Sequence, residues 1–372
     1  MSASAQPAAP SGPAPGPTAP DASLERLQAR LLAGVSRTFA LTIPELPPAL
    51  HHAVGNAYLL CRIVDTIEDE PTLHPVRKRS FCRQFVSVVQ GHEPAEAFAR
   101  ALAPLLSQHT LAAERELIRE VPAVIAITHA LRPAQQAAIA RCVQVMARGM
   151  AEFQTRASRS GLADMTSMDR YCYFVAGVVG EMLTELFCDY APAIEARRAT
   201  LMSCAVAFGQ GLQMTNILKD LWEDRARGVC WLPRDVFARA GFELEALDPH
   251  RFDPAFGAGL GELVGVAQGH LRSALTYSLA IPPEETGIRN FCLWALGMAL
   301  LTLRNINRRR DFRSGAEVKI TRRTVKLTVA ALRLSARHDR LLRGLLHLAG
   351  RSLPGGAPRT MERDLAQPRL KG

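Results

Sequence analysis

The sequence predicts an all-α protein built as one continuous helical domain. Strong helix formers dominate residues 24–348, and apolar side chains recur at three- and four-residue intervals, as in Ile139, Val143, Met146 and Met150. Prolines separate the helical stretches, and no alternating strand pattern with Asn-Gly or Asp-Gly turns occurs. No Gly-x-Gly-x-x-Gly fingerprint follows a strand, which argues against a Rossmann cofactor domain. We therefore expect a single helical bundle around a central apolar cavity.

Both ends of the chain have a different composition from this helical region. Residues 1–22 are almost entirely Ala, Pro, Ser and Gly, which bury too little apolar surface to offset chain entropy. They also lack the basic start and apolar run of a secretory signal, so we expect a disordered tail. Residues 351–372 are rich in Pro, Gly and charge, and they predict a second flexible tail after a domain at 23–350.

The formal net charge is +10, and much of the excess lies between Arg304 and Lys326. A basic surface suits nucleic acid, an anionic membrane or a phosphate-bearing ligand. No aromatic residues interleave with the basic ones and no nucleic-acid motif occurs, so we expect no nucleic-acid partner. The eight cysteines lack Cys-x-x-Cys spacing, which favours buried thiols in a reducing cytosol over a zinc site or disulfides.

The longest uninterrupted apolar run is residues 291–303. A membrane-spanning helix needs roughly 20 apolar residues, so the run predicts a buried helix and no transmembrane span. The expected location is the cytoplasm, with peripheral contact between the late basic face and anionic lipid as an alternative.

Three predicted helices are apolar nearly all round, namely Ala53–Val64, Val175–Leu186 and Ala205–Leu218. Helices of this kind line a core or a cavity, so acidic residues attached to them are informative. Two acidic motifs follow two of these helices. The first holds Asp65, Glu68 and Asp69, whose spacing puts three carboxylates on one helix face, and the second holds Asp220, Glu223 and Asp224.

Like charges at this spacing repel one another, and burial raises the cost unless a cation compensates. Mg²⁺ fits, because it takes a few carboxylates together with waters and phosphate oxygens. Either motif alone fits a solvated helix end equally well. The pair favours two carboxylate walls facing across a cavity and bridging diphosphate through metal. The residues thus indicate a metal-dependent prenyl diphosphate enzyme.

Four segments carry a resemblance to a known family. They are Ser36-Arg37-Thr38-Phe39, the first acidic motif at 65–69 (DTIED), residues 171–180 (YCYFVAGVVG) and residues 213–224 (QMTNILKDLWED). In this order they resemble the squalene/phytoene synthase family, and the resemblance covers about residues 24–328. Residues 168–172 (MDRYC), 291–303 and 315–320 (GAEVKI) are similar more specifically to its squalene synthase branch.

The resemblance implies an isoprenoid synthase-type fold and a two-step reaction. Two farnesyl diphosphates would condense head-to-head to presqualene diphosphate, and NADPH would then reduce this intermediate to squalene. One alternative is a dehydrosqualene or phytoene synthase, which omits the reduction. Another is an assembly factor that keeps the fold without catalysis.

The resemblance also implies roles for individual residues. The expected ligands of Mg²⁺, or of Mn²⁺ in its place, are Asp65, Glu68, Asp69, Asp220, Glu223 and Asp224. The expected catalytic residues are Tyr171 as general acid/base, Phe291 as a wall facing a carbocation, and Asp65 and Asp220. Expected substrate contacts are Arg37, Phe39, Arg62, Gln213, Asn216 and Arg227. Expected NADPH contacts are Lys319, Arg322 and Arg310. For Tyr171 and Phe291 core packing is the alternative, and for the NADPH set a solvated basic helix end.

The chain also departs from the family pattern. Val229 follows Gly228 where members often carry an arginine, so one diphosphate contact is missing or comes from Arg225 or Arg227. Residues 319–322 read Lys-Ile-Thr-Arg where squalene synthases tend to show Lys-Ile-Arg-Lys. The hydrophobic C-terminal anchor of eukaryotic members does not occur in this sequence. Prenyl chain length, NADPH against NADH and oligomeric state stay open.

Overall fold

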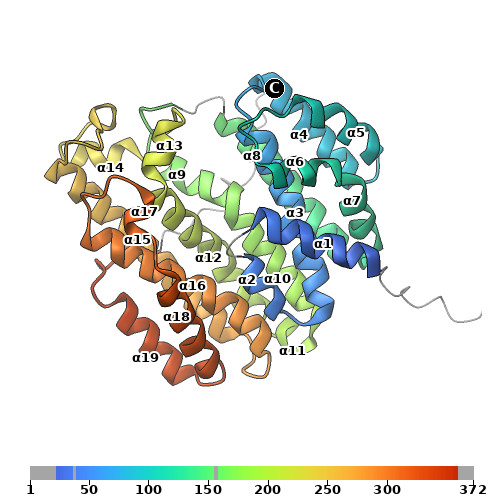
Figure 1. Cartoon of the computed structure of the whole chain (residues 1–372). Helices are drawn as coiled ribbons and strands as arrows, with labels where there is room; N and C mark the ends of the chain where they lie inside the picture. The colour runs from blue at the N-terminus through green and yellow to red at the C-terminus, as the bar shows by residue number, and fades with distance from the viewer. Residues whose placement is uncertain (1–21, 37–38, 155–157, 359–372) are drawn as a thin grey trace, which may run out of the picture.

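The computed structural model describes residues 22–36, 39–154 and 158–358 (Figure 1). Within these ranges the chain forms nineteen α-helices and no β-strand, with two isolated β-bridges, Leu162–Pro233 and Asp248–Arg251. The predicted all-α class is confirmed. The helices are α1 (Ala22–Val35), α2 (Phe39–Thr42), α3 (Pro48–Asp69), α4 (Pro75–Val89), α5 (Ala95–Leu102), α6 (Ala112–Arg119), α7 (Val121–Ala130), α8 (Pro133–Gln154), α9 (Met165–Cys172), α10 (Val178–Tyr190), α11 (Pro192–Glu195), α12 (Arg198–Lys219), α13 (Leu221–Ala226), α14 (Arg234–Arg239), α15 (Pro254–Ala280), α16 (Thr286–Arg308), α17 (Gly315–Val318), α18 (Arg322–Ser335) and α19 (Asp339–Gly350). Shorter helical turns are η1 (Ile43–Glu45), η2 (Ala103–Leu105) and η4 (Leu244–Ala246), and η3 (Tyr173–Gly177) is a π-helix.

Prolines mark helix starts. Pro48, Pro75, Pro133 and Pro254 are the first residues of α3, α4, α8 and α15. Proline is favoured there because its fixed φ suits the first turn and its missing N–H would have no partner within the helix. Several of the breakers expected between helices therefore lie at helix beginnings, while others, such as Pro71 and Pro249, lie in turns.

The centre of the bundle is α12, which packs against α10, α15 and α16. As predicted, this helix is buried over much of its length, from Leu201 to Leu218. Small residues let the backbones of neighbouring helices approach it closely. A Cβ added at Gly209 would lie 2.1 Å from the carbonyl oxygen of Ala176, so no larger residue fits there.

Most of the two expected tails, residues 1–21 and 359–372, lies outside the described residues. Ala22, assigned to the first tail, begins α1. The start of the second expected tail is packed on α15 instead of projecting from the fold. A Cβ added at Gly269 would lie 2.6 Å from the carbonyl carbon of Ala357, and Arg272 donates a hydrogen bond to Gly356.

Two helical stretches, Met165–Tyr190 and Thr286–Arg308, are long and apolar enough to cross a membrane by length and composition alone. Buried residues make up 61% and 72% of their most apolar windows, as in core helices of a folded protein. The run 291–303 is therefore buried as predicted, while the lack of a transmembrane span stays a prediction. All eight cysteines are free thiols and seven of them are buried, as expected.

Candidate active site

The first acidic motif forms the last turn of α3. Ile63, Val64 and Ile67 bury one side of this turn, which leaves Asp65 and Glu68 half-buried and Asp69 exposed on the other side. Side chains of the motif thus extend from a firmly packed helix.

Glu70, the next residue, fixes the end of this helix. Its buried carboxylate accepts hydrogen bonds from the backbone N–H and hydroxyl of Thr72, from the N–H of Ser107 and from the hydroxyl of Thr110. Burial alone raises the pKa of Glu70, but these hydrogen bonds outweigh it and lower the pKa to about 2.

The second acidic motif joins α12 to α13. Asp220 donates its backbone N–H to Asn216 at 2.8 Å, and Asp224 donates to Asp220 at 2.9 Å, so the helical path continues through the junction. Asn216, Asp220 and Asp224 therefore follow one another on one side. Gly228 ends this path with φ +88°, a value that glycine adopts without strain.

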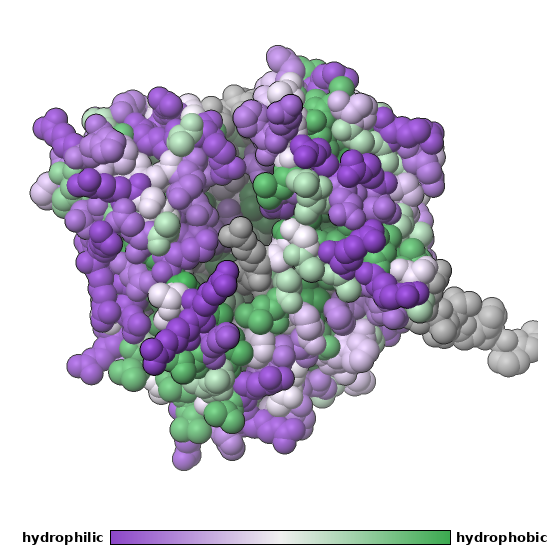
Figure 2. All heavy atoms as spheres, in the orientation of Figure 1, coloured by the Kyte–Doolittle hydropathy of each residue, from purple (hydrophilic) through white to green (hydrophobic). Residues whose placement is uncertain are grey.

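Arg227 joins the two motifs. Its Nη1 lies 3.5 Å from Oδ1 of Asp69, and its Nη2 donates to Oδ1 of Asp224 at 2.5 Å. The two carboxylate groups predicted to face each other therefore do so, on either side of one guanidinium. Figure 2 shows this face of the molecule hollowed at its centre, with hydrophobic surface inside the hollow.

Several carboxyl groups here bind protons more tightly than usual. Burial raises the pKa of Asp65 to about 7, with Asp69 and Glu114 adding to the rise and Arg62 opposing it. Burial also raises the pKa of Asp224 to about 6, against the opposing effect of Arg227. Burial is the main cause of both rises, and a bound divalent cation would stabilise the charged forms of these carboxylates.

Tyr171, on α9, lies beside both motifs. Its ring stacks on Trp231 at 4.1 Å and 8°, and it meets Phe153 edge-on at 5.4 Å. Burial raises its pKa well above the usual value, and the charges of Glu68 and Asp224 raise it further. Its phenol is therefore protonated at neutral pH. The π-helix η3 begins two residues later, and such segments often occur at functional sites.

Comparison with known proteins gives the family. The model of the family described as squalene/phytoene synthase matches residues 32–324. The chain belongs to the squalene/phytoene synthase family. It is 31% identical to the squalene synthase of Eremothecium gossypii over 286 residues, which are 74% of this chain and 60% of that protein. The chain thus spans about 60% of the length of this curated relative.

Solved structures of the squalene/phytoene synthase family share the fold. A structure of TcSQS in complex with a ligand aligns with a TM-score of 0.69 and 24% identity, covering 88% of this chain and 98% of that one. A dehydrosqualene synthase in complex with a ligand aligns with a TM-score of 0.61 and 17% identity, covering 83% and 94%. At these identities the likeness concerns the fold alone.

Among the substrate contacts expected from the family resemblance, Arg62 is engaged within the protein. It donates a short hydrogen bond to Glu114, and its Nη1 lies 3.7 Å from Oδ2 of Asp65. Arg37 lies outside the described residues. Gln213 is half-buried on α12, and Oδ1 of Asn216 accepts a hydrogen bond from Lys219 at 3.2 Å.

Val229 stands where the family often carries an arginine, and the two arginines considered in its place differ in their surroundings. Arg225 donates to the backbone carbonyls of Arg159 and Glu245, so it holds a loop. Arg227 faces the carboxylates instead. Of the two substitutes considered, the geometry favours Arg227.

Phe291 and Phe39 lie in a second aromatic group. Their ring centroids are 6.4 Å apart, Phe187 meets Phe291 edge-on at 6.2 Å, and Tyr58 lies 5.2 Å from Phe39. No ring contact of the described residues joins this group to the one around Tyr171. The structure thus contains two separate aromatic groups, and the roles of these residues stay predictions.

The basic residues expected to bind NADPH differ in their surroundings. Arg310 donates to the carbonyl of Gly257 at 3.0 Å and to Oδ1 of Asn307 at 2.6 Å, so it is bound to α15 and α16. Lys319 and Arg322 are exposed and follow α17. The first N–H of α17, at Gly315, donates to Glu223 at 3.0 Å. The basic segment therefore begins beside the second acidic motif, and Glu223 holds it there.

Among the described residues, no three His, Cys, Asp or Glu side chains are close enough to hold a metal ion by themselves. The six acidic residues stand in two groups with Arg227 between them. Their assignment as ligands of Mg²⁺ stays a prediction.

Three site residues were missed from sequence, namely Glu70, Glu114 and Trp231. Glu70 adjoins the first motif but does not share the helix face of its carboxylates, so its role in fixing the end of α3 was not predicted. Glu114 comes from α6, and its one sequence signal was that of an ordinary helix start, where it accepts the N–H of Leu111 at 3.3 Å. Nothing in the sequence pairs Trp231 with Tyr171.

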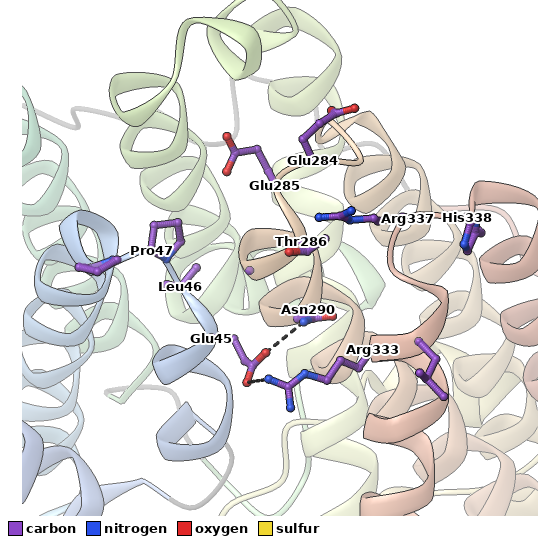
Figure 3. Close-up of a pocket in the computed structure, with 13 residues that line it drawn as sticks. Glu45, Leu46, Pro47, Glu284, Glu285, Thr286, Asn290, Arg333, Arg337 and His338 are labelled. Atoms are coloured by element: carbon purple, nitrogen blue, oxygen red, sulfur yellow. Dashed lines mark hydrogen bonds and ion pairs between the residues drawn. The ribbon is translucent and has the colours of Figure 1, made fainter.

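A groove of about 650 Å³ lies apart from these motifs, between η1, the start of α16 and the end of α18. Figure 3 shows the Glu45 carboxylate directed toward Asn290 and Arg333, at 3.0 Å and 3.3 Å. None of the residues predicted for catalysis or binding lines this groove.

Proposed function

We propose that this chain is a squalene synthase. It condenses two farnesyl diphosphates to presqualene diphosphate and then reduces this intermediate to squalene with NADPH. Membership in the squalene/phytoene synthase family and the names of the relatives support this proposal. The observation that carries it is the facing pair of acidic motifs, which Arg227 joins through Asp69 and Asp224.

The donor set of the site fits Mg²⁺, or Mn²⁺ in its place, because carboxylate oxygens are hard ligands. Asp65, Asp69, Asp220 and Asp224 would hold the ions, with Glu68 and Glu223 beside them. When bound, the metal neutralises charge on the leaving diphosphate and favours ionisation of the allylic C–O bond. Arg227 offers forked, permanently charged donors at the same place.

Tyr171 would supply a proton donor within a buried aromatic group. Its phenol is positioned beside both motifs and keeps its proton at neutral pH, so it can exchange a proton with a departing diphosphate. Its ring and that of Trp231 present π-electrons that stabilise a nearby carbocation. Phe291 and Phe39 would line the path of the prenyl chain.

Lys319 and Arg322 would contact the phosphates of NADPH, whose role is to supply a hydride. Arg310 could contact NADPH only after breaking its hydrogen bonds to Gly257 and Asn307. We place the enzyme in the cytoplasm and without a nucleic-acid partner.

Product analysis tests the proposal. The protein is incubated with farnesyl diphosphate and Mg²⁺, with and without NADPH, and the hydrocarbon products are identified by mass. Squalene formed only with NADPH is the expected result. Dehydrosqualene in both reactions would show that the enzyme carries out no reduction and acts as a dehydrosqualene synthase. No turnover, with geranylgeranyl diphosphate also inert, would favour an assembly factor.

A further inference from the structure

Helices α18 and α19 carry an unusual concentration of exposed leucines. Nine large apolar side chains are exposed among the described residues, and five of them lie on this pair. We call them the leucine surface: Leu327 and Leu334 on α18, and Leu341, Leu345 and Leu348 on α19, with 38–82% of each residue exposed. Their spacing of three, four or seven residues gathers them on one stripe of each helix.

These leucines are not needed to hold the pair in place. Leu332, Leu342 and Leu346 on the opposite sides are buried in the core. Buried Arg289 donates to the carbonyl of Ala336 and to Asp339, both at 2.8 Å, and so fixes the turn between the helices. The leucine surface is therefore a second apolar stripe on helices already anchored by their first.

The charges around the leucine surface have one sign. Residues 322–351 contain eight basic side chains and a single acidic one, Asp339, which Arg289 neutralises. Arg333 is paired with Glu45. The other basic residues are all exposed, namely Arg322, Arg323, Lys326, Arg337, Arg340, Arg343 and Arg351.

We propose that α18 and α19 dock onto the surface of an anionic phospholipid bilayer. Leucines at this spacing enter the boundary between headgroups and acyl chains, while flanking arginines reach the lipid phosphates. In Figure 2 hydrophobic surface gathers at the lower left, over α18 and α19, among hydrophilic side chains. A second copy of this chain would bring a surface of the same charge, which repels it. Nucleic acid would leave the leucines unused.

Vesicle sedimentation tests the docking. The full chain, without substrate, is mixed with sucrose-loaded vesicles of phosphatidylglycerol and phosphatidylcholine in equal parts, or of phosphatidylcholine alone. We expect pelleting with the anionic vesicles and at least ~10-fold weaker partitioning into the neutral ones. The variant Leu334→Ser/Leu341→Ser/Leu345→Ser/Leu348→Ser should lower partitioning at least ~10-fold. Arg340→Gln and Arg343→Gln should each lower it about fivefold.

The matched control is Val76→Ser/Leu111→Ser, which removes two exposed apolar side chains from α4 and from the start of α6. It should leave partitioning unchanged, and far-UV circular dichroism should show all variants folded. Three results would overturn the proposal: no pelleting with anionic vesicles, equal pelleting of the leucine variant, or equal loss in the control. A dimer that the leucine variant separates in light scattering would instead assign the surface to a contact between copies. Because no substrate is present, the outcome does not depend on the proposed reaction.

Discussion

Asp69 and Arg227 lie 158 positions apart in the chain and form an ion pair at 3.5 Å, while the same guanidinium donates to Asp224. Two acidic motifs from distant helices are thereby held on either side of one cation. Asp69 and Arg227 are both at least half-exposed, at 51% and 60% of their side chains, so this pair adds little to stability. The ion pair instead positions the guanidinium of Arg227 between carboxylates of the two acidic motifs.

Replacement of Arg227 by lysine should reduce catalysis without unfolding the protein. A lysine keeps the charge but cannot offer forked donors to two partners. We expect kcat/KM for farnesyl diphosphate to fall ~10–100-fold, with the melting temperature almost unchanged. Arg239→Lys is the matched control, since Arg239 pairs with Asp235 and Glu262 outside the site. Unchanged kcat/KM in Arg227→Lys would remove Arg227 from the site.

The hydroxyl of Tyr171 should matter more than its ring. Tyr171→Phe keeps the stacking on Trp231 and removes the proton, so kcat should fall ~10²–10⁴-fold while KM changes little. Tyr190→Phe, a half-buried tyrosine at the end of α10, should leave steady-state rates unchanged. A wild-type kcat in Tyr171→Phe would show that Tyr171 serves only in core packing.

Glu70 should make stability depend on pH in the acid range. Its pKa is lowered to about 2 in the folded state, against 4.5 for the ordinary group. The folded state therefore gains stability above about pH 4.5, and this gain is lost as pH falls from there toward 2. Glu70→Gln should lower the free energy of unfolding by ~1–3 kcal/mol at pH 7.

Urea unfolding of wild type and Glu70→Gln between pH 3 and pH 7 checks this expectation. The difference between the two proteins should shrink as pH falls below about 4.5. Glu243→Gln, at an exposed position, should follow the wild type throughout. A difference that stays constant with pH would show that the Glu70 carboxylate is not the stabilising form.

Arg289 should be the most sensitive charged residue outside the acidic motifs. Its buried guanidinium donates to the carbonyls of Ile281, Leu279 and Ala336 and to Asp339. Arg289→Ala should destabilise the protein by about 3–5 kcal/mol, because several buried acceptors lose their partner. Hydrogen exchange should rise first in α18 and α19. Equal exchange there in both proteins would contradict the anchoring role.

The sequence was sufficient for the helices and both acidic motifs because local periodicity carries that information. The apolar runs ending at Val64 and Leu218 belong to α3 and α12, and the acidic residues continue both helical paths. Family resemblance added Tyr171, whose place beside both motifs no spacing rule could reveal.

Contacts between residues from distant segments of the chain could not be predicted from the sequence. The expected substrate contact Arg62 donates to Glu114 of α6, and the expected cofactor contact Arg310 donates to Gly257 of α15. Neither of these partners could be read from the sequence. The fully buried position of Arg289 had no sequence signal, because the carbonyls that satisfy it come from the end of α15 and from the residue after α18. Such contacts depend on tertiary packing, which sequence periodicity does not encode.

Turnover of farnesyl diphosphate by Asp65→Asn, Asp220→Asn and the double variant tests the central claim most directly. If both motifs serve one site, each single variant should lower kcat by ~10³-fold or more, and the double variant should be little worse than either. Thermal melting of all three checks that they fold. Wild-type rates in either single variant, or losses that multiply in the double variant, would contradict a single shared site.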